Sequence, residues 1–188
     1  MKKFTALFVA LIALGIFSSF ALAVEVPTLN APFIVTTCGQ SPGAVMIHMS
    51  AMQAKVAANH DNKLTASKLA DTGAKTLIVT SGTSMKGMGA AGTNVENEIA
   101  RCTELIAEAK KLGMAVVGAH IEGMARRTDN SDAASIEAVM KDADVILVVN
   151  DSDSDGFFTK YAADHNKPLI VVKDALAVGQ ALKAATEK

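Results

Sequence analysis

The chain is predicted to form an α/β three-layer sandwich around an open, parallel, doubly wound five-stranded sheet. Five short apolar runs rich in β-branched residues recur along it, continuous rather than alternating in hydrophobicity, as in strands buried on both faces. Helical patterns separate the runs, so right-handed crossovers would connect parallel strands. We expect a Rossmann-like or flavodoxin-like arrangement with strand order 2-1-3-4-5. The predicted strands are residues 33–37, 75–80, 114–119, 144–149 and 168–172.

Residues 1–23 have the pattern of a secretory signal peptide. Lys2 and Lys3 precede an apolar run over residues 4–20, and Ala21-Leu22-Ala23 forms a cleavage site, with cleavage predicted after Ala23. The alternative is an uncleaved anchor, but the apolar run is short for a membrane span. We therefore predict a periplasmic or secreted protein with no membrane span after cleavage.

The remaining chain is predicted to comprise an extended lead-in, residues 24–32, and a single domain, residues 33–188. Without Lys2 and Lys3 it keeps 16 basic and 19 acidic side chains, a net charge of −3. A mildly acidic protein has no electrostatic reason to bind nucleic acid. We predict no nucleic-acid partner.

The first helix is predicted from about residue 42 to residue 58. Ser41 followed by Pro42 is a common helix start, with the serine as N-cap and the proline at the first helical position. The helix carries methionines at helical spacing, at positions 46, 49 and 52. Beside His48 their thioethers would suit Cu(I), although core packing is the simpler interpretation. The predicted core stripe is Val45, Met49, Met52 and Val56.

A polar, glycine-rich loop over residues 81–94 follows the second predicted strand, and a helix over residues 95–111 follows the loop. Thr93 and Glu96 have the spacing of a capping box at the start of that helix. A loop of this length in a compact domain commonly has a function. Further helices are predicted over residues 132–141, 157–165 and 175–186, separated by polar loops at 120–131 and 150–156.

These loops place polar and glycine residues at the carboxyl ends of the strands, where open α/β sheets bind their ligands. The connections at the opposite edge are mostly short and ordinary. We therefore predict a ligand-binding rim in which lysine, arginine and helix N-termini favour an anion. The candidate ligand-binding residues are Gly39, Gln40, Ser41, Thr83, Ser84, Lys86, Gly87, His120, Glu122, Arg126 and Arg127.

Two catalytic or cofactor motifs match this sequence only in part. Residues 39–43 fit G-x-S-x-G, but Pro42 has no backbone N–H to contribute to the oxyanion hole of a nucleophile elbow. Residues 87–92 fit G-x-G-x-x-G, but they begin well after the strand end, and no acidic residue closes the next strand at the expected distance. The cofactor therefore stays unassigned.

The run Asp151-Ser152-Asp153-Ser154-Asp155-Gly156 matches the first half of a calcium loop. The twelfth position, where a bidentate glutamate is needed, is Ala162. A complete EF-hand is excluded, and a weak calcium site at Asp151, Asp153 and Asp155 stays open. Otherwise these carboxylates would cap the following helix, where negative charge suits the helix dipole.

Four segments of the chain form a recognisable set: Gly39-Gln40-Ser41, the loop GTSMKGMGAAG, Glu122-Gly123 with Arg126-Arg127, and Asp155-Gly156-Phe157-Phe158. Together they resemble an uncharacterised family of secreted bacterial domains of unknown function. The resemblance covers nearly the whole predicted mature chain, and it implies a Rossmann-like domain outside the cytoplasm without implying any catalytic residue.

Two functions are compatible with this sequence. The first is a periplasmic or secreted domain that binds a small anionic molecule at the strand carboxyl ends. The alternative is a secreted hydrolase or transferase that uses His120 with Glu122 or Asp151 as acid–base groups. A hydrogen bond between His120 and a nucleophile in a pocket would favour the enzyme.

Overall fold

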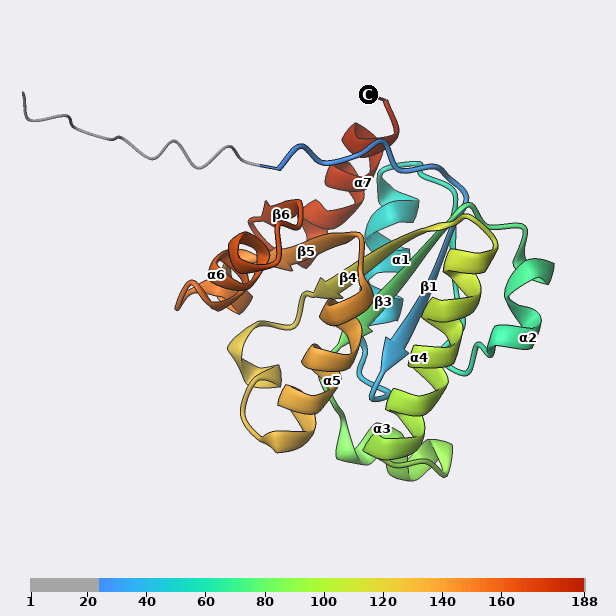
Figure 1. Ribbon diagram of the computed structural model, residues 1–188, viewed down its shortest axis with the longest axis vertical. Helices are drawn as coiled ribbons and strands as arrows, with labels where there is room; N and C mark the ends of the chain where they lie inside the picture. Colours follow the sequence, from blue (N-terminus) through green and yellow to red (C-terminus); the bar gives the residue numbers. More distant parts are fainter. Residues whose placement is uncertain (1–23, 188) are drawn as a thin grey trace, which may run out of the picture.

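The computed structural model describes residues 24–187 and shows one parallel sheet between two layers of helices (Figure 1). Within these residues the sheet has six strands in the order β2-β1-β3-β4-β5-β6. The strands are β1 Phe33–Cys38, β2 Ala58–His60, β3 Thr76–Ser81, β4 Ala115–His120, β5 Val145–Val149 and β6 Leu169–Val172.

The prediction of five strands in the order 2-1-3-4-5 is wrong in its count and in one placement. The short strand β2 pairs with the outer edge of β1, with Val35 opposite His60. It occupies the edge position that we assigned to the strand at residues 75–80, and the five predicted strands therefore lie side by side in chain order. Three half-buried or exposed residues at a sheet edge form no apolar run, so β2 left no hydrophobic signal.

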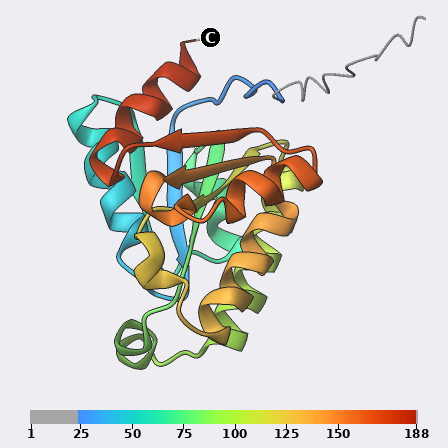
Figure 2. The same ribbon diagram turned by 90° about the vertical axis from the view of Figure 1, so that its left-hand side faces the viewer.

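Helices cover both faces of the sheet (Figure 2). One face packs against α1 and α7, and its core includes Phe33, Val35 and Ile47. The other face packs against α2, α4, α5 and α6, and its core includes Leu77 and Leu105. The bounds are α1 Gly43–Gln53, α2 Ala66–Leu69, α4 Val95–Lys111, α5 Asn130–Asp142, α6 Phe157–Asp164 and α7 Val178–Thr186. The short 3-10 turns are η1 Ala70–Thr72, η2 Gly123–Arg126, η3 Asn150–Asp153 and η4 Ala175–Ala177.

Helix α1 buries a different stripe from the one predicted, although Val56, which follows the end of the helix, does belong to the core. Met49 and Met52 are 57% and 61% exposed, so core packing does not explain them. The small residues of the helix face the core because α7 approaches closely there, and the Gly179 amide donates a hydrogen bond to Ser50 Oγ (2.8 Å). The buried residues are Gly43, Ala44, Ile47, Ser50 and Ala51.

The glycine-rich loop after β3 contains a helix that we did not predict, α3 Met85–Ala91, beyond the carboxyl edge of the sheet (Figure 1). Ser84 Oγ accepts from the Gly87 amide (3.1 Å) at its start, and Met88 anchors it by burial. The predicted cap of α4 was also wrong by one residue, because Asn94 accepts from the Asn97 amide (2.9 Å).

The lead-in at residues 24–32 packs against the domain through Leu29. The Leu29 side chain is buried, and its amide donates to the Ala185 carbonyl of α7 (3.0 Å). The predicted signal peptide lies outside the described residues. Within residues 24–187, every helix is too short or too polar to cross a lipid bilayer.

Candidate functional site

The loops after β1, β3 and β4 meet at the carboxyl edge of the sheet. Gln40 forms an isolated antiparallel bridge with Thr83, which joins the first two loops. Arg126 Nη1 donates to the Thr83 carbonyl (2.7 Å), which joins the loop after β4 to the other two loops. The structure thus brings together three of the predicted site residues, linked by a backbone bridge between Gln40 and Thr83 and by the Arg126 guanidinium.

Glu122 occupies the N-terminus of α1, where we predicted an anionic ligand. Its Oε1 accepts from the Gly43 amide (3.0 Å), and its Oε2 accepts from Arg126 Nε (3.1 Å). The predicted cap, Ser41, is instead buried with its hydroxyl 3.3 Å from that of Thr37. The protein's own carboxylate therefore satisfies both the helix terminus and the arginine.

Gln40 belongs to a buried polar cluster that sequence reasoning missed. Glu98 on α4 is almost fully buried, and its Oε2 accepts from the Gly39 amide (3.3 Å), Gln40 Nε2 (3.0 Å) and Arg101 Nη2 (2.7 Å). A charged residue at position 98 shares the buried face of the helix with Cys102 and Leu105, and this was the signal that could have revealed the cluster. The cluster holds the first loop against α4.

His120 is fully buried at the end of β4. Its Nδ1 lies 3.0 Å from Ser81 Oγ, and its Nε2 lies 3.3 Å from the Gly123 carbonyl. Burial is the main cause that lowers the pKa of His120 to about 4, against the weaker opposing effect of the hydrogen bond to Gly123. The ring is therefore neutral and enclosed near pH 7, and its side-chain partner is Ser81 rather than Ser41 or Asp151.

This burial predicts a pH-dependent stability. The unfolded histidine binds a proton below its ordinary pKa of about 6.5, whereas the folded one does so only near pH 4, so stability falls as pH drops through this window. We expect the free energy of unfolding to decrease by about 2 kcal/mol between pH 7.5 and pH 5. Urea denaturation of the wild type and His120→Gln at both pH values measures the effect. An equal decrease in the variant would contradict it.

Arg127 joins the β4 loop to the start of α6. Its guanidinium forms a bidentate pair with Asp155 (2.7 and 3.0 Å), donates to the Ser152 carbonyl (2.9 Å) and lies 4.4 Å from the centre of the Phe157 ring. The hydrogen bond from Arg127 is the main cause that lowers the pKa of Asp155 to about 2. Arg127 is thus engaged within the protein.

The acidic residues of the calcium-like run act as backbone hydrogen-bond acceptors. Asp153 Oδ1 accepts from the Phe158 and Thr159 amides (2.7 and 3.1 Å) at the start of α6, and Asp151 Oδ2 accepts from the Met124 amide (3.1 Å). Residues 24–187 contain no group of three His, Cys, Asp or Glu side chains placed to hold a metal ion. The geometry supports the capping interpretation.

A second carboxylate that we did not predict, Asp132, organises the β3 loop. Its Oδ1 accepts from the amide and hydroxyl of Thr83 (2.8 and 2.7 Å), and its Oδ2 accepts from the Thr128 amide (3.0 Å). Burial acts to raise the pKa of Asp132, but the hydrogen bonds from Thr128 and Thr83 outweigh it, so the pKa is lowered. The carboxylate is ionised at neutral pH and holds two loops together.

The residues predicted on the glycine-rich loop have separate roles. Ser84 caps α3, and Gly87 lies so close to Gln40 that a Cβ there would approach the Gln40 carbonyl to 2.2 Å. Lys86 is exposed on α3.

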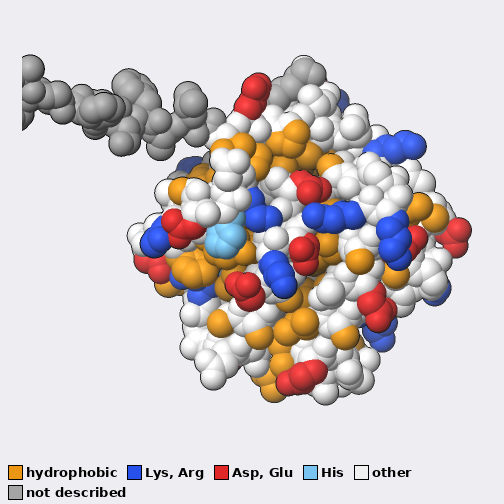
Figure 3. Space-filling model, in the orientation of Figure 1, with side chains coloured by type: hydrophobic (Ala, Val, Ile, Leu, Met, Phe, Trp, Pro, Cys, Tyr) orange, Lys and Arg blue, Asp and Glu red, His pale blue; other side chains and the backbone are white. Residues whose placement is uncertain are grey.

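The surface charges do not form a patch of one sign on the face seen in Figure 3. Lysine, arginine and acidic side chains are interspersed over that face.

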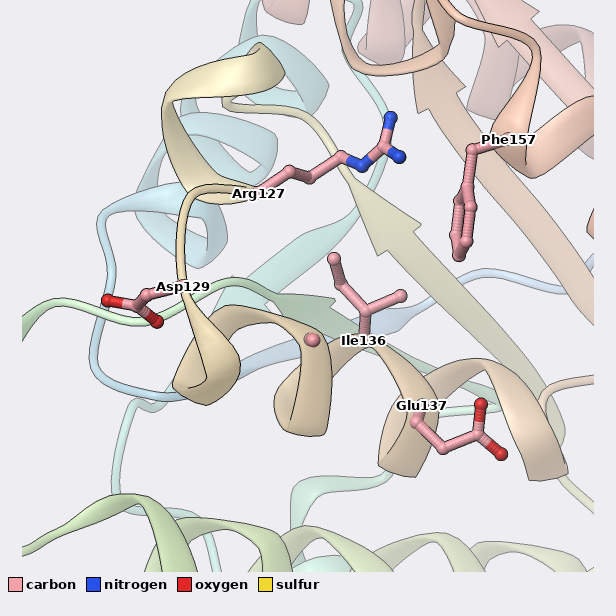
Figure 4. Close-up of a pocket in the computed structure, with 6 residues that line it drawn as sticks. Arg127, Asp129, Ile136, Glu137 and Phe157 are labelled. Carbon is pink, nitrogen blue, oxygen red and sulfur yellow. The ribbon is translucent and has the colours of Figure 1, made fainter.

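An open cleft of about 370 Å³ lies beside this edge, between α5 and the start of α6. Figure 4 shows Arg127 reaching toward Phe157, with Ile136 of α5 pointing up between them. The floor is largely apolar, and Glu137 stands on α5. Asp129 caps the start of that helix by accepting from the Ser131 and Asp132 amides (2.9 and 3.0 Å), and its carboxylate points away from Phe157 in Figure 4. The lining residues are Arg127, Asp129, Ala133, Ile136, Glu137 and Phe157.

The sequence matches the protein family described as Domain of unknown function (DUF6305) over residues 30–186. The chain belongs to this family. The DUF6305 match runs from the end of the lead-in to the end of α7, so it includes every loop of the site and both walls of the cleft. No curated protein matches the chain.

The chain also has a weak likeness to two solved structures. One is a GDSL-like lipase from Bacteroides thetaiotaomicron, with a TM-score of 0.38 and 8% identity over 82% of this chain and 84% of that one. The other is a candidate acylhydrolase from Bacteroides fragilis, with a TM-score of 0.35 and 7% identity over 78% and 71%. At these values the likeness supports no statement about the activity of the DUF6305 chain.

Proposed function

We propose that this protein binds a small molecule in the cleft between α5 and α6, at the carboxyl edge of the sheet. The observation that carries the proposal is a largely apolar cleft of about 370 Å³ with Ile136 on its floor and the half-exposed Phe157 on its wall. Ligand sites in proteins have this size and this mixture of apolar surface with a few polar groups. With its predicted signal peptide, the protein would act in the periplasm or outside the cell.

The charges around the cleft favour a ligand with an apolar body and a cationic or hydrogen-bond-donating group. Asp155 neutralises Arg127, and Asp129 is engaged as the N-cap of α5, so Glu137 is left to dominate the local charge. An apolar ring could stack on Phe157 while its amine faces Glu137. The anionic ligand predicted from the sequence has less support, since Glu122 engages Arg126 and the N-terminus of α1.

The enzyme alternative has weaker support than binding. Its acid–base group, His120, is buried and neutral near pH 7, and its neighbour Ser81 is also buried. Glu122 is held by the Gly43 amide and by Arg126. A general base must reach the proton that it abstracts, and neither group is presented to the cleft.

Two probes that share a ring and differ in charge test the proposal: benzylamine and benzoate. In two-dimensional NMR titrations of the wild type we expect benzylamine to shift the amides of Ile136, Glu137 and Phe157. Phe157→Ala is expected to weaken binding about tenfold, which corresponds to about 1.4 kcal/mol. Leu176→Ala is the matched control, because Leu176 is an exposed apolar residue outside the cleft.

The titrations separate the two ligand classes. Benzoate shifts centred on Lys86 and Arg126 would instead support the anion-binding rim predicted from the sequence. Benzylamine shifts that persist in Phe157→Ala, or the absence of shifts at the cleft with either probe, would contradict the proposed site.

A further inference from the structure

We propose that His48, His60 and Met52 form a Cu(I)-binding site between α1 and β2. The site lies at the β2 edge of the sheet, whereas the cleft lies between α5 and α6 beside the far strands. It therefore constitutes a second function, separate from the cleft.

The fold brings the two histidines together from different elements. His60 pairs in register with Val35, whose side chain belongs to the core on the α1 face, so the His60 side chain also points to that face. His48 stands on α1, which packs beside β2. The centres of the two imidazole rings lie 4.8 Å apart, with their planes inclined by 42°.

This spacing suits two imidazoles bound to one metal ion. With metal–nitrogen bonds of about 2.0–2.1 Å, two ring centres on one ion stand roughly 5.2 Å apart at a tetrahedral angle. The observed 4.8 Å needs only a slightly smaller angle at the metal or a small shift of the exposed His60 ring. In addition, His48 Nδ1 is buried and has no hydrogen-bond partner within residues 24–187. A buried polar atom without a partner costs free energy, and metal coordination would remove that cost.

The third ligand indicates which metal is bound. Met52 follows His48 by one helical turn, where side chains at i and i+4 are neighbours, and its side chain is 61% exposed. Thioethers are soft ligands that favour Cu(I). Zn²⁺ would need further nitrogen, thiolate or carboxylate ligands, and the described residues supply no group of three such side chains here. The chemistry of the three donors therefore favours Cu(I).

Competition of the untagged protein with a chromogenic Cu(I) chelator tests the site. We expect one Cu(I) per chain, and binding of Zn²⁺ at least about 100-fold weaker. His60→Ala and Met52→Leu should each weaken Cu(I) binding by more than the roughly 10- to 100-fold that is typical of losing an outer-shell partner. Both positions are exposed, so both variants should fold, and circular dichroism checks this.

Two variants serve as matched controls. His165→Ala removes an exposed histidine from α6's end, and Met85→Leu removes an exposed methionine from α3; both should bind Cu(I) as the wild type does. X-ray absorption of the Cu(I) complex should show nitrogen and sulfur ligands. The proposal is overturned if the wild type does not compete for Cu(I), if His60→Ala and Met52→Leu bind as tightly as the wild type, or if no sulfur ligand is seen.

Discussion

Replacement of Arg101 by alanine is expected to lower the free energy of unfolding by about 3–5 kcal/mol, measured by urea denaturation at pH 7. The side chains of Arg101 and Glu98 are only 14% and 4% exposed. Arg101 also donates to Thr36 Oγ1 (3.2 Å) and to the Leu64 carbonyl (2.9 Å). Its removal would leave a buried carboxylate without its countercharge and backbone carbonyls without donors, and both effects are costly.

The matched control is Lys160→Ala, which breaks the exposed ion pair with Asp164. That pair is at least as short, at 2.5 Å against 2.7 Å, but its side chains are 76% and 53% exposed. We expect a loss below about 0.5 kcal/mol, because solvent screens exposed pairs. Similar losses in both variants would contradict the view that burial, rather than distance, sets the energy.

The double variant Arg101→Met/Glu98→Gln separates the lost countercharge from the lost packing. It removes both charges and keeps most of the volume, so it should be more stable than Arg101→Ala. If Arg101→Ala itself costs less than about 1 kcal/mol, the cluster does not hold the β1 loop to α4 as proposed.

Replacement of Gly179 by alanine is expected to destabilise the protein by about 2–4 kcal/mol. A Cβ at this position would lie 2.0 Å from the Ser50 carbonyl oxygen and 2.9 Å from the Ala51 amide nitrogen, both in the backbone of α1. Backbone cannot move aside as a flexible side chain can, so α7 would have to shift off α1. Alanine normally stabilises a helix relative to glycine by about 1 kcal/mol, so the expected sign is reversed.

Gly89→Ala provides the comparison, because Gly89 lies inside helix α3 with no atom within 4 Å of an added Cβ. There we expect the ordinary helix-propensity gain, up to about 1 kcal/mol. Thermal unfolding of both variants tests whether Gly179→Ala lowers the stability and Gly89→Ala raises it. If Gly179→Ala were more stable than the wild type, α7 would not pack as closely against the backbone of α1 as the structure shows.

The sequence predicted the five long strands to within one or two residues, because a strand buried on both faces is a continuous apolar run. It missed β2 and α3 for the same reason: neither has such a run, and both depend on contacts with distant parts of the chain. The stripe of α1 was wrong because methionine and valine are apolar, yet the approach of α7 at Gly179 requires small residues on the buried face.

The sequence predicted where the candidate site lies better than it predicted which residues contact one another there. The carboxyl edge does gather the loops that carry Gln40, Glu122 and Arg126. Whether a charged side chain faces a ligand or another residue depends on pairings over 40 to 80 positions of sequence, such as that of Glu122 with Gly43. The spacing of residues along the chain does not indicate such pairings. The sequence therefore could not show that Arg126 and the N-terminus of α1 already have Glu122 as their hydrogen-bond partner.

The edge strands of the sheet also affect how copies of the protein meet. At one end of the sheet β2 offers only three residues of unpaired backbone, and at the other β6 offers four. Lys55 and Lys63 flank the first, and Lys167 and Lys173 flank the second. Short edges bordered by lysine are poor templates for strand addition by another chain. We expect the folded protein to resist edge-to-edge aggregation even at high concentration.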